Sequence, residues 1–520
     1  TMQEETEPAT GRASRREWIG LAVIALPCLL YSMDLTVLHL AVPALTADLQ
    51  PTSAQLLWII DIYGFLVAGS LITAGTLGDR IGRRRLLMIG AALFGIASIL
   101  AAFSTTAEML IATRALLGIA GATVAPSTLS LIRNMFHDPH QRTVAISVWI
   151  MSYSIGGAIA PLVGGVLLEL YWWGSVFLIA VPVMALLLVI GPRLLPEYRD
   201  PDAGRLDLVS AALSLGAVLA MIFGLKEIAQ DGPSVAALLV ILAGVMIGVV
   251  FVRRQLTLQD PLVDLRLFRV PGFSASLATY GLTILVLFGG FLFLPQYLQL
   301  VLGLSPLTAG LWTLPWALAF ILGSIVTPQV ARRTRPAILM TVGLVVSAIG
   351  YWMTTGFDVH THFAAFAAAT FVFSLGVAPV VTLTTDLILG SAPPERAGAA
   401  SALSETSAEF GGALGIAIFG SVGVAIYRVL VGDVVPAGVP GDAAESARAT
   451  LAGAVALAQQ LPGRDGAPLA DAARQAFVRG LQLCAAISAL VSVGLAVFVA
   501  TALRHIRPAS ERDALQPQPR

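Results

Sequence analysis

Long apolar runs, separated by breaks rich in charge, proline or glycine, follow one another along nearly the whole chain. About 20 apolar residues suffice to cross the hydrocarbon core of a bilayer as a helix. Several runs are longer, which implies tilted helices or helices that extend beyond the bilayer. The pattern predicts fourteen spans, near residues 18–42, 54–78, 86–105, 108–133, 143–170, 174–192, 206–226, 234–253, 272–301, 305–331, 336–356, 362–390, 397–427 and 476–504.

Composition supports a polytopic membrane protein. Of the 520 residues 57% are hydrophobic and 12% charged, a balance that soluble domains rarely tolerate. Zero net charge argues against nucleic acid as a partner. Cys28 and Cys484 both fall in predicted spans, so no disulfide scaffold is expected. The polar start, residues 1–17, is too long and acidic for a signal peptide, and the first span is expected to be retained.

The distribution of basic residues predicts the orientation. With both termini cytoplasmic, the inner segments hold 24 Lys and Arg residues, and six lie outside, mostly in one long loop. Arg114 lies within a span, and the lone lysine, Lys226, is expected in an outer segment. One lysine against thirty arginines is typical of a GC-rich bacterial genome. We therefore expect a multi-pass protein of the bacterial cytoplasmic (inner) membrane.

The long outer loop, residues 428–475, is the one sizeable soluble element. Leu451, Val455 and Ala458 share one face of a helix-compatible run, and the segment 462–466 is typical of a turn. A second short helix is expected from Leu469 towards Phe477. The pattern predicts a helical hairpin, residues 443–475, over the outer mouth; a linker with no role in transport is the alternative.

Acidic residues inside the spans are the main candidate chemistry. Asp34 lies within the apolar run 19–41, and Asp61, Glu405 and Glu409 have similar surroundings, with no lysine beside them. Ionisable groups in a membrane span are costly and usually mark an ion or substrate pathway. These four acids are therefore candidate sites for protons and cationic cargo.

Asp34 is the first candidate for proton coupling, although it could instead only hydrogen-bond a neighbouring helix. Asp61 lies between Trp58 and Tyr63 in the sequence. An acid beside aromatic rings suits a lipophilic cation through charge and cation–π attraction. The competing interpretation is that Asp61 is a permanently buried partner for Arg114, whose charge costs about 2.5–3.5 kcal/mol in a span unless it faces a cavity or an acid.

Glu405 and Glu409 are four residues apart and therefore share one helix face. They could line the cavity as a second acidic site, or Glu405 could lie solvated at the cytoplasmic mouth. Asp386 is expected at the membrane interface. Large aromatic residues could wall a pocket, or could serve as packing and interface anchors; the candidates are Tyr31, Trp149, Tyr153, Phe291, Trp312 and Trp316.

Glycine-rich motifs lie between and within the spans. Between the second and third predicted spans, glycines that allow a tight turn and close helix approach surround one acid and a basic cluster. Asp79 of this segment can meet the positive end of a neighbouring helix or an arginine. The segment contains Gly75, Gly78, Asp79, Arg80, Gly82 and Arg83, and a second motif in the fifth span contains Gly156, Pro161, Gly164 and Gly165.

The segment 75–85 resembles the signature loop of the major facilitator superfamily. Residues 33–43, Arg114 with Gly118 and Gly121, and the antiporter-like motif around Pro161 make the chain similar to its fourteen-helix drug:proton antiporters, the group of the quaternary ammonium compound pumps. The resemblance implies a proton relay of Arg114 with Asp34. The chain departs from the family at His39, where Asn is common, and at Ala160. The second signature loop, around 331–336, is decayed, and the tenth span carries no acid.

The expected fold is an all-α polytopic membrane protein of the major facilitator type. Residues 1–17 form an N-terminal tail, 18–192 a six-helix bundle, 206–253 two inserted helices, 272–504 a second six-helix bundle, and 505–520 a cytoplasmic tail. The motif around Pro161 is expected to allow a bend where the two bundles rock.

The expected function is proton-coupled export of lipophilic organic cations by alternating access. A proton-coupled exporter of one antibiotic or metabolite is the alternative, and the Pro161 segment makes an uptake symporter less favoured. Scattered histidines and separated cysteines argue against a metal site and an enzyme, and no Walker loop implies ATP. The expected partners are the cation, protons and membrane lipid. No cofactor is expected, and the chain is expected to be a monomer.

Overall fold

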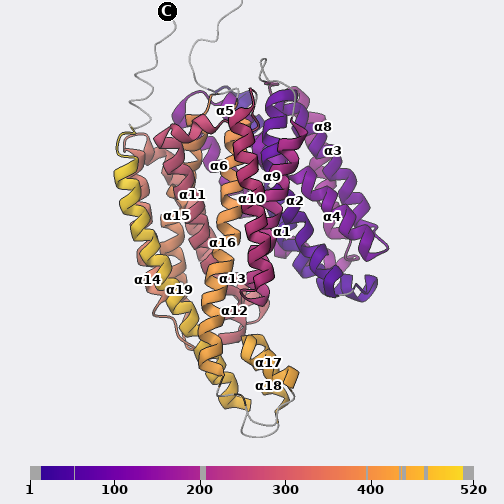
Figure 1. Cartoon of the computed structure of the whole chain (residues 1–520), viewed down its shortest axis with the longest axis vertical. Coiled ribbons are helices and arrows are strands. Elements are labelled where there is room, and N and C mark those ends of the chain that lie inside the picture. The colour runs from indigo at the N-terminus through magenta and orange to yellow at the C-terminus, as the bar shows by residue number, and fades with distance from the viewer. Residues whose placement is uncertain are drawn as a thin grey trace, which may run out of the picture.

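The computed structural model describes residues 13–51, 53–199, 207–259, 261–393, 396–432, 435, 441–461 and 466–506. The regular elements of these residues are all helical (Figure 1). Thirteen helical segments are long and apolar enough to cross a membrane, by length and composition. The remaining predicted span, 143–170, corresponds to the 32-residue helix α6, Pro139–Leu170. The prediction of an all-α polytopic membrane protein is confirmed.

Eight helices form what we call the first half. The apolar run predicted at 108–133 is two helices, because the chain turns at Ala122 and Thr123. Helix starts have the expected caps: Thr106 accepts a hydrogen bond from the Met109 N–H, and Asp138 from the Gln141 N–H. The helices are α1 (Arg15–Leu49), α2 (Ser53–Ile81), α3 (Arg83–Ala102), α4 (Ala107–Gly121), α5 (Val124–Met135), α6, α7 (Ser175–Leu178) and α8 (Ala180–Leu194).

The second half follows an inserted pair of helices, α9 (Leu208–Asp231) and α10 (Val235–Thr257). Helix α9 packs against both α2 and α16, while α10 presents large apolar side chains outwards, such as Leu239 at 59% exposure. The helices of the second half are η1 (Leu265–Arg269), α11 (Pro271–Phe291), α12 (Leu294–Gln296), η2 (Tyr297–Val301), α13 (Pro306–Ala331), α14 (Pro336–Thr354), α15 (Phe363–Ser391), α16 (Ala397–Val431), α17 (Gly441–Ala449), α18 (Leu451–Gln460) and α19 (Gly466–Ala502).

The predicted hairpin in the long loop is partly wrong. Helix α18 begins at the predicted apolar run, but the expected second short helix is the beginning of α19, which runs on without a break. Leu469, Ala473 and Phe477 are buried, so the apolar face of the last span continues into this segment. Helices α17 and α18 pack on each other, and we call this pair the hairpin. It belongs to the second half, since α18 packs against α19 and the Tyr427 hydroxyl donates to the Ala447 and Thr450 carbonyls. Of the predicted turn at 462–466, residues 462–465 lie outside the described residues, and Gly466 begins α19.

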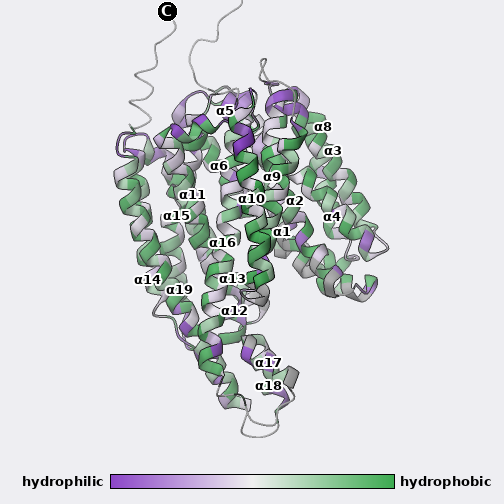
Figure 2. Ribbon diagram, viewed as in Figure 1, coloured by the Kyte–Doolittle hydropathy of each residue, from purple (hydrophilic) through white to green (hydrophobic). Residues whose placement is uncertain are grey.

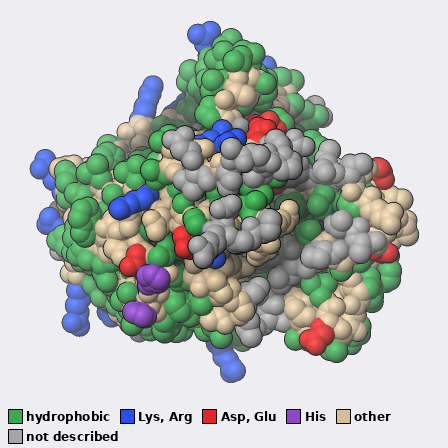
Figure 3. Space-filling model, turned by 90° about the horizontal axis from the view of Figure 1, so that it is seen from below, with side chains coloured by type: hydrophobic (Ala, Val, Ile, Leu, Met, Phe, Trp, Pro, Cys, Tyr) green, Lys and Arg blue, Asp and Glu red, His purple; other side chains and the backbone are tan. Residues whose placement is uncertain are grey.

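Polar side chains gather at one end of the molecule (Figure 2), where α1 begins and α19 ends. Ion pairs at this end include Arg84 with Glu197 and Arg254 with Asp207. We call it the basic end. The opposite face carries mostly hydrophobic side chains with scattered charges (Figure 3). Apolar helix surfaces that end in a band of charged residues are typical of helices in a bilayer.

Candidate functional site

A buried ion pair lies at the centre of the first half. The Arg114 Nη1 donates to the Asp34 Oδ2 at 2.6 Å, and its Nε donates to the Ile59 carbonyl at 3.3 Å. The guanidinium also lies over the Tyr63 ring, 4.5 Å from the centroid. The Arg114 side chain is 2% exposed and that of Asp34 15%. Arg114 therefore pairs with Asp34, and the interpretation of Asp61 as its partner is wrong.

Small residues bring the helices of this pair together. A Cβ on Gly118 of α4 would lie 2.6 Å from the Tyr63 carbonyl, and one on Gly156 of α6 would lie 2.3 Å from the Leu29 carbonyl. These distances are too short for any side chain, so α4 contacts α2 directly and α6 contacts α1. Two glycines of the sequence motifs therefore allow α4 to pack closely on α2 and α6 to pack closely on α1.

Asp61 has a lysine beside it, contrary to the expectation. The Lys226 Nζ of α9 donates to the Asp61 Oδ1, and it lies 4.6 Å from the centroid of the Phe65 ring. Helix α9 continues to Asp231, so Lys226 lies within a helix that packs against α2. The two residues are 165 positions apart, so no local sequence pattern predicts that they pair. The one available signal was that Lys226 is the lone lysine of the chain.

The two glutamates of α16 face the first half. Glu409 lies within interaction range of the Tyr31 hydroxyl and of Lys226. Glu405 is partly buried, and its Oε1 is buried with no hydrogen-bond partner among the described residues. Glu405 is therefore not the solvated group of the alternative interpretation.

Aromatic side chains fill the space between the acids. The ring of Tyr31 lies 6.1 Å from that of Tyr63 and 5.7 Å from that of Tyr153, and Trp149 lies 4.6 Å from Tyr153. The Trp149 Nε1 donates to the Thr128 Oγ1 at 2.9 Å. Eight predicted site residues thus lie together, and we call them the central cluster: Asp34, Arg114, Tyr31, Tyr63, Trp149, Tyr153, Glu405 and Glu409.

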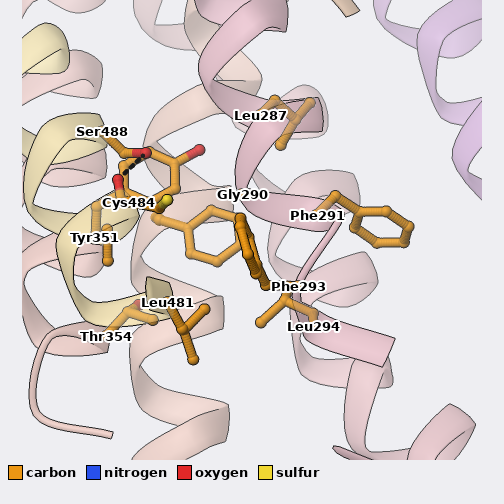
Figure 4. A pocket seen from close by; sticks show the side chains of 12 residues that line it. Leu287, Gly290, Phe291, Phe293, Leu294, Tyr351, Thr354, Leu481, Cys484 and Ser488 are labelled. Carbon is orange, nitrogen blue, oxygen red and sulfur yellow. Dashed lines mark hydrogen bonds between the residues drawn. The ribbon is translucent and has the colours of Figure 1, made fainter. Parts of the chain in front are cut away.

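Other predicted aromatic residues lie apart from the central cluster. Trp58 is 44% exposed and lies 6.3 Å from Phe65. Trp312 packs against Phe363 and Phe366, and Phe291 lies 5.5 Å from Trp316. Phe291 also lines an apolar pocket within the second half, between α11, α14, α15 and α19 (Figure 4). That pocket contains no residue of the central cluster.

Asp79 joins the two halves at the basic end. Its Oδ1 accepts hydrogen bonds from the Arg83 Nε at 2.9 Å and from the Gly398 N–H at 3.1 Å, and its Oδ2 accepts one from the Ala399 N–H at 3.0 Å. The amide groups belong to the first turn of α16, where a carboxylate is favoured. Asp79 therefore meets both partners that the sequence offered as alternatives, an arginine and a helix N-terminus. A Cβ on Gly75 would lie 2.4 Å from the Gly398 carbonyl.

A second contact between the halves lies at the same end. The Arg142 Nε donates to the Asp386 Oδ1 at 2.7 Å, and the Thr143 hydroxyl donates to its Oδ2 at 3.2 Å. Asp386 is 1% exposed, so the expectation of an interfacial residue is wrong. Towards the opposite end the indigo helices of the first half and the orange helices of the second half diverge (Figure 1). The hydrogen bonds described between the halves thus gather at the basic end.

Several predicted motif residues have simpler surroundings. Gly82 has a φ of 109°, a conformation that favours glycine, at the turn before α3. A Cβ on Gly78 would lie 3.2 Å from a Leu86 methyl group, and a Cβ on Gly165 would meet no atom within 4 Å. Arg80 lies in the last turn of α2. Gly164 is buried in α6, which also contains Pro161; the side chains of Pro161 and His39 lie outside the described residues.

The central cluster combines acids with aromatic rings. Among the described residues no group of three or more His, Cys, Asp or Glu side chains could bind a metal ion. Carboxylates next to aromatic faces are instead the groups that recognise organic cations. The arrangement places three such carboxylates, Asp34, Glu405 and Glu409, around buried tyrosines.

Comparisons with known proteins show what the whole chain is similar to. The family model described as Major Facilitator Superfamily matches residues 24–416. The chain is 44% identical over 501 residues to the multidrug efflux pump LfrA of Mycolicibacterium smegmatis, covering 96% of this chain and 99% of the relative. It is 35% identical over 496 residues to the methyl viologen resistance protein SmvA of Salmonella typhimurium, covering 94% and 100%.

A further relative is the tetracenomycin C resistance and export protein of Streptomyces glaucescens, 32% identical over 94% of this chain and 93% of the relative. Among solved structures, the human organic anion transporter MFSD10 aligns with a TM-score of 0.59 over 93% of this chain and 99% of the other. At 15% identity that likeness shows the fold alone.

Proposed function

Because this chain belongs to the major facilitator superfamily, and is therefore a transporter, we propose that it is a proton-coupled antiporter that exports lipophilic organic cations. Relatives that match nearly the whole chain are named as efflux, resistance or export proteins, which supports export as the direction. Methyl viologen, in the name of one relative, is an organic cation, which supports the cargo class.

The observation that carries the proposal is the central cluster. A carboxylate paired with a buried arginine in the first half lies close to two glutamates of the second half, with tyrosines between them. Buried acids in a span can exchange protons, and a cation competes with protons for the same oxygens. A site of this kind can exchange protons for cationic cargo.

Asp34 and Arg114 are the proposed coupling pair. When Asp34 is ionised, it neutralises Arg114, which is otherwise a costly buried charge. When a proton binds Asp34, the guanidinium loses its charged partner and retains the Ile59 carbonyl and the Tyr63 ring. Each proton that enters or leaves therefore changes the electrostatics between α1, α2 and α4.

The contacts at the basic end provide the alternating part of the cycle. In this structure Asp79 and Asp386 tie the two halves there, and the opposite ends diverge. We propose that the basic end is cytoplasmic, so the structure is closed towards the cytoplasm. Cargo enters when these contacts open, and it leaves when they form again.

The setting of the cycle is part of the same proposal. We place the chain in a bacterial cytoplasmic membrane with both termini inside, since basic residues gather at that end. The proton gradient supplies the energy, and the chain works as a monomer without a cofactor.

The alternative function is proton-coupled export of one antibiotic or metabolite. The relative named for tetracenomycin C favours it, because its name specifies a single compound. The acids other than Asp34 distinguish the two functions: a neutral cargo gains little from Asp61, Glu405 and Glu409.

The experiment is transport of a fluorescent lipophilic cation into inverted vesicles or proteoliposomes under an imposed pH gradient. Wild type is compared with Asp34→Asn and Asp61→Asn. Gradient-driven movement that is lost in Asp34→Asn and weakened in Asp61→Asn is expected. Retained gradient-driven transport in Asp34→Asn, or no cation transport by folded wild type, would refute the coupling assignment or the cargo class respectively.

A further inference from the structure

We infer that Lys226 is a tethered occupant of the cation site: its ammonium binds Asp61 when cargo is absent, and an arriving organic cation displaces it. The inference rests on the proposed function and gives the inserted helix α9 a part in it. Lys226 would then set the affinity for cargo, because every cation must compete with a charge that is always present.

The surroundings of the Lys226 ammonium are those that an organic cation requires. It binds one carboxylate oxygen of Asp61 and lies 4.6 Å from the centroid of the Phe65 ring. Phe65 is 6% exposed, and the rings of Phe223 and Trp58 lie 6.1 and 6.3 Å from it. A carboxylate combined with an aromatic face binds ammonium groups in general. The contacts of Lys226 therefore indicate that Asp61 and Phe65 together suit an organic cation.

The pair is exposed enough to open. The side chains of Lys226 and Asp61 are 34% and 20% exposed, whereas those of Arg83 and Asp79 are 0% and 8% exposed. Lysine carries its charge on a flexible four-carbon stem, and a partly exposed pair leaves that stem room to move. Lys226 therefore has more freedom to leave Asp61 than Arg83, which is fully buried, has to leave Asp79.

The position of α9 connects this pair to the central cluster. Helix α9 packs against α2 of the first half and α16 of the second half. Lys226 accordingly lies beside Asp61 and also within electrostatic reach of Glu409. A cation that displaces Lys226 from Asp61 leaves the lysine close to a second acid, so the charge of the displaced ammonium stays compensated.

A tethered group competes at an effective concentration in the millimolar range when its tether is short. Removing the ammonium should therefore lower the Kd of a monovalent organic cation, by about tenfold if competition dominates. A purely structural pair that fastens α9 to α2 would give the opposite result, because its loss would loosen the site or leave the Kd unchanged.

The first test measures equilibrium binding of tetraphenylphosphonium to the purified full chain by calorimetry. Lys226→Met should lower the Kd about tenfold, and Lys226→Arg should retain the wild-type Kd. The gain should vanish in Lys226→Met with Asp61→Asn, since the freed carboxylate is then absent. Arg254→Met is the matched control. Arg254 lies on α10 and forms an ion pair with Asp207, the N-cap of α9, and these side chains are 37% and 18% exposed. Its Kd should not change.

The second test uses wild type and so does not depend on a variant that folds. Lys226 is the only lysine of the chain, so amine labelling followed by peptide mass spectrometry reports on this side chain alone, apart from the N-terminal amine. Saturating tetraphenylphosphonium should accelerate labelling of Lys226, because a displaced amine no longer lies against Asp61 and Phe65 and is more accessible to the reagent.

An unchanged or raised Kd in folded Lys226→Met, or labelling that cargo leaves unchanged or slows, would overturn the inference. Failure of the proposed function is a separate result, since wild type would then not bind the cation at all. Wild-type binding with no effect at Lys226 would refute only the tethered occupant.

Discussion

Replacing Asp79 with asparagine is expected to weaken the closure of the basic end. The carboxylate accepts hydrogen bonds from Arg83 in its own half and from the Gly398 and Ala399 amides in the other half. Asparagine keeps the shape of the side chain but replaces one acceptor oxygen by a donor. Arg83 is fully buried and requires the retained oxygen, so the new NH₂ group faces the Ala399 N–H.

The magnitude follows from these contacts. A hydrogen bond to a charged group contributes about 1.5–3 kcal/mol, and a neutral one about half as much. Asp79→Asn loses one charge-assisted bond between the halves and makes the second one neutral, which costs the closed state roughly 2–4 kcal/mol in total. Since 1.4 kcal/mol is a factor of ten, the equilibrium shifts about 30- to 700-fold towards the state open at the basic end.

The assay is the distance distribution between spin labels at the basic end. Cysteines at positions 85 and 333, both exposed there, place one label on each half, and the buried native Cys28 and Cys484 are replaced by serine. Wild type should give mainly the shorter distance, and Asp79→Asn a large population at a longer distance.

Glu197→Gln is the matched control, because Glu197 contacts Arg84 and Arg85 at the same end but stays within the first half. An unshifted distribution in folded Asp79→Asn, or an equal shift in Glu197→Gln, would contradict the proposed role of Asp79. The first outcome would show that the α16 amides do not hold the halves together, and the second that any lost charge opens this end.

Four further predictions follow from single contacts. Arg142→Ala leaves buried Asp386 without its cation, so the free energy of unfolding should fall by roughly 3–5 kcal/mol, which a lower melting temperature would report. The double variant with Asp386→Ala should recover part of this lost stability; additive losses would contradict the pairing. Gly156→Leu should disrupt the contact of α6 with α1 and abolish folding or transport, while Gly165→Leu on the same helix, with open space around it, should be tolerated; equal effects would refute the close-approach argument. Deleting 441–461, which spares α19, should leave transport largely unchanged, because the hairpin packs on its own half; lost transport with normal expression would make it part of the exit. Asp207→Ala should lower thermal stability by about 1 kcal/mol through loss of the α9 cap. Arg254 and Ser210 hold the pKa of Asp207 well below its usual range, so this contribution should be complete above about pH 4 and should fade only in stronger acid. A stability difference between wild type and Asp207→Ala that disappears near neutral pH would refute this prediction.

The sequence determined the helices and the candidate chemistry. Apolar runs of bilayer length predict the spans because the period and length of such runs are local properties. The placement of arginine predicts a charged end, and the structure has a hydrophilic end that contains Arg84 and Arg254 (Figure 2). Local spacing also indicated that Asp79 would meet a helix end or an arginine, and that the glycines of its segment, such as Gly75, would allow close helix approach.

The tertiary structure alone decided which charged groups pair. Asp34 and Arg114 are 80 residues apart, and Asp61 and Lys226 are 165 apart, so no spacing rule connects them. Helices that are apolar all round have no polar stripe to show which face turns towards which neighbour. The same holds for Asp386, whose burial depends on Arg142 in the other half. Composition and length place a charge within a span, but only the packing of the helices determines its partner.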